Sequence, residues 1–111
     1  GLIEGKVIKI SNEKNKEIKI PHIGWNEIYP NNNKKEWKNK ILKIPLIGKS
    51  FYFVHSFICL TKDSDSTIAV CNYSDISIPA VVATGNVFGC QFHPEKSSDN
   101  GLAVLKNFCE I

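Results

Sequence analysis

The stretch GCQFHPEKS, residues 89–97, carries the side chains of this sequence that are best suited to proton transfer. His93 and Glu95 lie two positions apart, so in an extended segment both side chains point to the same side. A carboxylate beside an imidazole orients the ring and makes it more basic, but the pair supplies no nucleophile. The spacing therefore predicts the base half of a Cys-His-Glu or Ser-His-Glu triad.

The spacing of the cysteines does not supply the nucleophile that such a triad needs. Cys90 precedes His93 by three residues, which places the two side chains on opposite faces of one strand. Cys59 shares a strand face with His55, but four residues of strand separate them by roughly 13 Å, too far for a hydrogen bond. A serine nucleophile stays open, although the sequence has no G-x-S-x-G elbow.

The cysteine pattern also indicates the redox state and the metal content. The sequence has no C-x-x-C pair and no histidine at a zinc-ligand spacing, so we expect no disulfide framework, no metal site and no cofactor. The cysteines are predicted to be reduced, small apolar side chains of the core. They are Cys59, Cys71, Cys90 and Cys109.

Composition excludes several classes of protein. The 111 residues form one domain or part of one, with 42% apolar and 23% charged residues. The formal charge of +3 comes from 14 Lys plus Arg against 11 Asp plus Glu, without a compact basic stripe, so we expect no nucleic-acid partner. No apolar stretch approaches the ~20 residues that span a bilayer, so we expect a cytoplasmic protein.

Short β-type runs precede a single helical pattern along the chain. The predicted strands cover residues 6–10, 17–25, 51–60, 66–73 and 78–92, the last of which divides into two at Gly85 and Asn86. Ile18 and Ile20 are expected to share one sheet face. Both faces of the 51–60 run are apolar, which predicts a strand covered on both sides, as in an α/β sheet.

Polar segments separate these runs, and a helix follows them. Residues 11–16 and 29–40 are predicted to be surface loops, the second around Trp37 and with room for one helical turn. Near the C-terminus the apolar period becomes helical, with Ser98 or Asp99 placed to cap the first turn. The expected core stripe of this helix consists of Leu102, Leu105, Phe108 and Cys109.

These elements place the proton-transfer pair at the edge of a sheet. Pro94 has no N–H group and biases the preceding residue toward an extended conformation, so the strand should end at Phe92 or His93. Ligands of open α/β sheets bind at the carboxyl ends of strands. His93 and Glu95 are therefore predicted to lie where a substrate binds.

Three motifs, in this order, resemble a known family. VFGCQFHPEKS and the following GLAVLKNF resemble the C-terminal signature of class I (triad-type) glutamine amidotransferases. IPHIGWN (20–26) and FYFVHSF (51–57) are similar, more specifically, to the glutaminase subunits of imidazole glycerol phosphate synthases. The resemblance covers essentially the whole chain. It implies the C-terminal half of a flavodoxin-like α/β amidotransferase domain, with a mixed β-sheet and a covering C-terminal helix.

The resemblance implies a mechanism for the pair. In that family a cysteine in a Gly-x-Cys-x-Gly turn attacks the side-chain amide of glutamine. The histidine that matches His93 moves protons between the thiol and the leaving ammonia, and the glutamate that matches Glu95 orients it. By the same matching, Val54, Ser56 and Phe57 line the glutamine pocket, and Phe57 replaces the tyrosine that is common there.

The resemblance also implies a partner. The ammonia passes to a (β/α)8-barrel cyclase subunit for histidine biosynthesis, in a heterodimer. Trp25, Tyr52 and Lys96 match positions that face this cyclase near the ammonia passage. On pattern alone, His22 and His55 fit satisfied structural histidines better than catalysts, and we assign no role to either.

The family's cysteine turn belongs to an N-terminal half that these 111 residues do not contain. We therefore expect the chain alone to lack glutaminase activity, and to aggregate or to associate with a complementing half. Two other functions stay open: ammonia supply for the amidation of surface sugars, and a non-catalytic interaction module. An upstream Gly-x-Cys-x-Gly segment in the DNA, and the neighbouring genes, would discriminate among them.

Overall fold

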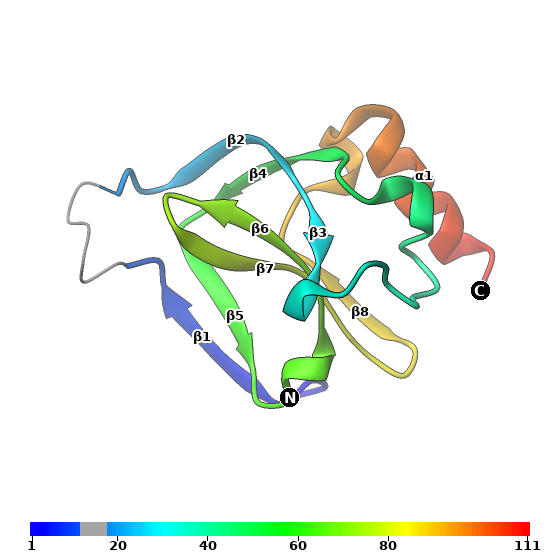
Figure 1. The fold of residues 1–111 in the computed structure, drawn as a ribbon, viewed down its shortest axis with the longest axis horizontal. Coiled ribbons are helices and arrows are strands. Elements are labelled where there is room, and N and C mark those ends of the chain that lie inside the picture. The colour runs from blue at the N-terminus through cyan, green and yellow to red at the C-terminus, as the bar shows by residue number, and fades with distance from the viewer. Residues whose placement is uncertain (12–17) are drawn as a thin grey trace.

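A computed structural model describes residues 1–11 and 18–111, which form eight strands, four 3-10 turns and one α-helix (Figure 1). The strands are β1 (Gly5–Lys9), β2 (His22–Glu27), β3 (Tyr29–Pro30), β4 (Ser50–His55), β5 (Phe57–Thr61), β6 (Thr67–Tyr73), β7 (Ile76–Thr84) and β8 (Val87–Cys90). The helical elements are η1 (Asn31–Asn33), η2 (Ile44–Leu46), η3 (Ser64–Ser66), η4 (Pro94–Lys96) and α1 (Ser98–Cys109).

The strands form three antiparallel groups. β1 pairs with β5, β2 pairs with β4, and β3, β6, β7 and β8 form a four-stranded sheet in that order. In Figure 1, β6 and β7 occupy the middle of the molecule, and α1 lies at the side opposite to β1. The fold therefore combines layered sheets with one C-terminal helix.

The hairpin of β7 and β8 confirms the predicted turn. Gly85 has a φ of 59°, a left-handed conformation that glycine adopts without steric cost, and Asn86 completes the two-residue connection. The strand ends earlier than expected, at Cys90 rather than at Phe92 or His93. After Cys90 the backbone leaves β7. The Gln91 N–H still donates to Ala80 O at 2.8 Å, but the His93 N–H donates to Tyr52 O on β4.

The predicted strand 51–60 is two strands. β4 pairs with β2 and β5 pairs with β1, and the break falls at Ser56, whose carbonyl accepts the Ile10 N–H at 2.9 Å. Phe53 on β4 is fully buried, whereas Phe57 on β5 is 54% exposed. The expectation of one strand covered on both faces was wrong, because the bend lets a single apolar run serve two different sheets.

The predicted strand 17–25 begins only at His22, while residue 17 and most of the expected loop 11–16 lie outside the described residues. Ile18 and Ile20 precede the strand, so the sheet face expected for them was wrong. Pro21 explains the late start, because it has no N–H to donate to a ladder.

The segment 29–40 is not simply a surface loop. Its η1 turn confirms the expected helical turn, but Tyr29 and Pro30 form strand β3 against β6. Trp37 is only 5% exposed and donates its indole N–H to Lys43 O at 3.1 Å. The expectation of a surface loop was wrong for Trp37, because its polar neighbours in the sequence gave no sign that it is buried.

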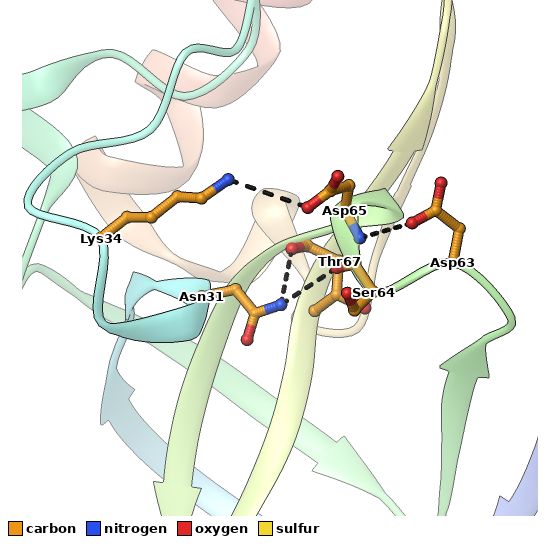
Figure 2. Close-up of polar contacts among 6 residues, drawn as sticks. All are labelled: Asn31, Lys34, Asp63, Ser64, Asp65 and Thr67. Carbon is orange, nitrogen blue, oxygen red and sulfur yellow. Dashed lines mark hydrogen bonds and ion pairs between the residues drawn. The ribbon is translucent and has the colours of Figure 1, made fainter.

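Polar contacts fix this segment to the η3 turn, as Figure 2 shows. The Asn31 side-chain amide donates to Ser64 O at 3.2 Å and to Thr67 O at 3.0 Å. Lys34 Nζ lies 3.9 Å from Asp65 Oδ1 in an exposed ion pair, which contributes little to stability. The amide of Asn31 is therefore the main link, because it satisfies two backbone carbonyls.

The core lies between the sheets and the helix. Phe92, which directly precedes His93, packs against Phe51 with ring centroids 4.3 Å apart and the rings tilted by 34°, and it meets Phe53 edge-on at 5.9 Å. This packing fixes the residue that precedes His93. Other fully buried members of the core are Ile10, Ile28, Leu42, Cys71, Ile78 and Val81.

Helix α1 packs through a face that the apolar pattern did not predict. Its buried residues are Gly101 and Val104, whereas Leu102 is 63% exposed. The other residues of the expected core stripe, Leu105, Phe108 and Cys109, are exposed as well. Gly101 decides the packing, because a Cβ atom there would lie 1.9 Å from Pro94 O.

The residue at the helix N-cap also differs from the expectation. It is Ser97, rather than Ser98 or Asp99, and its side chain makes no capping bond because its hydroxyl contacts other groups. Asn100 on the first turn donates its amide to Ser50 O at 3.0 Å. The helix start is therefore attached to the beginning of β4.

Candidate active site

His93 and Glu95 form the predicted pair. His93 Nδ1 lies 2.8 Å from Glu95 Oε1, and both side chains are partly exposed. The Glu95 carboxyl accepts hydrogen bonds from the Glu95 backbone N–H and from the His93 ring. These bonds lower the pKa of the Glu95 carboxyl below its ordinary value. The anionic carboxylate therefore holds a proton on Nδ1 and leaves the Nε2 lone pair of His93 free to accept one.

The backbone of His93 is held at both of its polar groups. The residue is extended, with φ −96° and ψ 101°, as expected before a proline. Its N–H donates to Tyr52 O at 3.0 Å, and its carbonyl accepts the Lys96 N–H at 3.0 Å. Strand β4 and turn η4 thus position the imidazole, and Pro94 is the first residue of this turn.

Two of the four cysteines are poorly suited to act as the nucleophile of the pair. Burial raises the pKa of the Cys71 and Cys90 thiols to about 12, so their thiolate fraction at neutral pH is negligible. All four cysteines are free in the structure, and the expectation that all four lie in the core was wrong. Cys59 and Cys109 are exposed because each occupies an outward position of its strand or helix.

An apolar patch, Ile23, Trp25, Tyr52 and Val54, covers the outer face of strands β2 and β4. Ile23 is directly opposite Val54, and Trp25 is directly opposite Tyr52 with ring centroids 6.0 Å apart. Trp25 is 53% exposed. Because Tyr52 O binds the His93 N–H, this β2–β4 patch borders the proton-transfer pair.

The remaining predicted positions lie around the same strand. Lys96 is exposed on turn η4, one residue after Glu95. Val54 belongs to the β2–β4 patch, whereas Ser56 and Phe57 lie at and beyond the bend. Their roles in a glutamine pocket and at a partner interface stay predictions.

His22 and His55 have hydrogen-bond partners inside the fold. His22 is fully buried and lies stacked against Phe53 and Tyr73. Its Nδ1 lies 2.8 Å from His55 Nε2, and its Nε2 lies 2.7 Å from Asn26 Oδ1. Burial lowers the pKa of both histidines, so the pair is neutral near pH 7.

The sequence reasoning missed Ser97 at this site. Its side chain is fully buried and contacts both β4 and the His93 carbonyl. A signal was present, since Ser97 follows HPEK directly and precedes a helix, but a serine there suggested only a helix cap.

The described residues hold neither a candidate metal cluster nor a helix that could span a membrane. Residues 1–11 and 18–111 contain no group of three or more His, Cys, Asp or Glu side chains that could hold a metal ion. Within the same ranges, no helix has the length and the apolar character needed to cross a membrane.

Comparison with known proteins identifies the class of protein. The glutamine amidotransferase class-I family matches residues 3–111, so the chain belongs to this family, which confirms the predicted fold class. Curated relatives carry the name imidazole glycerol phosphate synthase subunit HisH. The subunit HisH 1 of Legionella pneumophila (strain Lens) is 39% identical over 113 residues, which cover 100% of this chain and 53% of that protein.

Two further relatives carry the same subunit name. HisH of Pyrococcus furiosus is 41% identical over 108 residues, covering 97% of this chain and 50% of that protein. HisH of Methanosarcina barkeri is 46% identical over 112 residues, covering 99% of this chain and 50% of that protein. The chain thus spans about half the length of the curated relatives that it matches.

Proposed function

We propose that this chain supplies the acid–base half of a glutaminase site. The protein would be the glutaminase subunit of imidazole glycerol phosphate synthase, which hydrolyses glutamine to glutamate and ammonia for histidine biosynthesis. The observation that carries the proposal is the 2.8 Å contact between His93 Nδ1 and Glu95 Oε1, within a segment that the family matches. The names of the curated relatives support the histidine pathway over other ammonia acceptors.

The free Nε2 of His93 is suited to the proton transfers of amide hydrolysis. It accepts the proton of a cysteine thiol as the sulfur attacks the amide carbon of glutamine, and it then gives that proton to the departing ammonia. In the second half of the reaction it deprotonates the water that attacks the thioester carbon, and it returns this proton to the cysteine thiolate that leaves as glutamate forms. Glu95 stabilises the imidazolium that forms in both halves. The thiol comes from the Gly-x-Cys-x-Gly turn that the resemblance implies.

The β2–β4 patch is proposed as the contact with the cyclase. Exposed aromatic and aliphatic side chains in one continuous patch are typical of the centre of a protein interface. The patch borders His93 through Tyr52, so ammonia released there would enter a partner docked on it without crossing open solvent. Lys96 would lie at the rim. The resulting assembly is a cytoplasmic heterodimer with a (β/α)8-barrel cyclase, and it combines glutaminase with lyase activity.

A chimera tests the catalytic proposal. The N-terminal half of the Pyrococcus furiosus subunit is fused ahead of residue 1, the chimera is mixed with the cyclase subunit of that organism, and glutamate release from glutamine is measured. We expect the 111-residue chain alone to release none and the chimera to be active. His93→Asn should lower kcat by about 100-fold or more, because general acid–base catalysis contributes 10²–10⁴.

A matched carboxylate provides the control. Glu95→Gln removes the anion beside His93. Glu110→Gln removes an exposed glutamate whose ion-pair partner within the described residues is Lys43, at 4.0 Å. We expect a fall in kcat for Glu95→Gln alone. Glutaminase activity in the 111-residue chain by itself, or an active His93→Asn chimera, would refute the proposed roles.

A further inference from the structure

Three hydrogen bonds form a closed ring around the backbone of His93. The His93 N–H donates to Tyr52 O at 3.0 Å, the Tyr52 N–H donates to Ser97 Oγ at 2.9 Å, and the Ser97 hydroxyl donates to His93 O at 2.6 Å. The ring therefore joins strand β4 to both polar groups of the residue that carries the imidazole.

The chemistry of the ring requires a side chain that donates and accepts at the same point. A hydroxyl does both, whereas alanine does neither and a thiol does both weakly. Ser97 is fully buried, so water cannot easily replace its hydroxyl. Loss of the Ser97 hydroxyl would leave the Tyr52 N–H without its protein partner. The His93 carbonyl would keep, within the described residues, the Lys96 N–H as its donor.

Backbone contacts hold Ser97 itself in place. Its N–H donates to Pro94 O at 3.1 Å, and its carbonyl accepts the Gly101 N–H at 3.1 Å. The hydroxyl thus projects from a fixed turn toward β4. Ser97 makes no side-chain capping bond, and the hydrogen bonds of its hydroxyl within the described residues are the two of the ring.

We propose that Ser97 is a positioning residue for His93, and this inference rests on the proposed glutaminase function. Ser97 sets the distance between β4 and the segment that carries His93 and Glu95, and so directs the free Nε2 toward the reacting thiol. A displacement of about 1 Å at a catalytic group can cost 100-fold in rate. We expect Ser97→Ala to lower kcat by about 10-fold to 100-fold with little change in KM.

The test compares two buried hydroxyls. Thr67, 9% exposed, has its Oγ1 2.9 Å from Thr61 Oγ1 on strand β5, and it takes no part in the His93 ring. Ser97→Ala and Thr67→Val each remove one buried hydroxyl, so both should destabilise the fold comparably. Glutaminase kinetics are measured in the chimera with its cyclase. The His93 ring resonances are compared by NMR in the chimera.

The outcomes separate this inference from the proposed function. A lower kcat and shifted His93 resonances in Ser97→Ala, but not in Thr67→Val, support the positioning role, and Ser97→Cys should be intermediate. If Ser97→Ala fails to fold, Ser97→Cys provides the same comparison. Equal kcat in the two variants, or unmoved His93 resonances, would overturn it. An inactive parent chimera would count against the proposed function, while the resonances would still decide the role of Ser97.

Discussion

The contact between helix α1 and turn η4 leads to a quantitative prediction for Gly101→Ala. The added Cβ would lie 1.9 Å from Pro94 O and 2.8 Å from Ser97 Cβ. An ordinary contact between carbon and oxygen is about 3.3 Å or longer, so the helix and the turn must separate by roughly 1.4 Å. Neither obstacle is the end of a flexible side chain, so backbone has to move.

Two effects of opposite sign determine the net free energy of unfolding. Alanine favours a helix over glycine by about 1 kcal/mol, whereas overpacking a tight contact costs about 1–3 kcal/mol and occasionally more. The helix is only 12 residues long and Gly101 lies on its buried face, so the clash should dominate. The 1.9 Å approach to a backbone oxygen places the overpacking cost at about 3 kcal/mol, the upper end of its range. After the helix gain of about 1 kcal/mol, we expect a net destabilisation of about 2 kcal/mol, or a Tm lower by about 8 °C.

Urea denaturation followed by circular dichroism measures this change. Leu102→Ala is the control, because this neighbouring side chain is largely exposed and its loss should cost about 0.5 kcal/mol or less. A Gly101→Ala variant as stable as the parent would refute the reasoning. Stabilisation by about 1 kcal/mol would show that helix propensity alone acts at this position.

Two further predictions follow from the lowered and raised pKa values. Burial lowers the pKa of His22 and His55, so at acidic pH the folded state binds fewer protons than the unfolded state. The contribution of the two histidines to the free energy of unfolding is therefore complete above about pH 6.5 and is lost as the pH falls through the lowered pKa values. Urea midpoints at about pH 7.5 and pH 5.5 should therefore differ, and less so in His55→Gln; an equal difference in both proteins contradicts this account. Iodoacetamide at about pH 8 should alkylate the two exposed cysteines in the folded chain and spare Cys71 and Cys90, whose pKa is about 12, as mass spectrometry of the peptides would show.

Local chemistry made much of the site predictable. The two-residue spacing of His93 and Glu95, with Pro94 between them, restricts the backbone enough to bring both side chains together, and the structure confirms their contact at 2.8 Å. The turn at Gly85 was predictable for the same reason, because few residues tolerate its conformation. Such features depend on neighbours in the sequence.

Long-range packing decided the features that the sequence did not reveal. The burial of Trp37 depends on a contact with Lys43 and the core, not on its polar neighbours. The break at Ser56 depends on strand partners that lie far away in the chain. A periodic pattern shows which residues share a face of a strand or helix, but it does not show which other element packs against that face.

The sequence by itself determined the family motif, the orientation of His93 toward Glu95 and the succession of strands followed by one C-terminal helix. Only the tertiary structure decided which face of α1 is buried, because the close approach of Gly101 to Pro94 outweighs the leucine stripe. It also decided that Ser97 closes a hydrogen-bond ring with Tyr52, 45 residues away in the chain. Both results depend on distances between elements, which the spacing of residues along a chain does not encode.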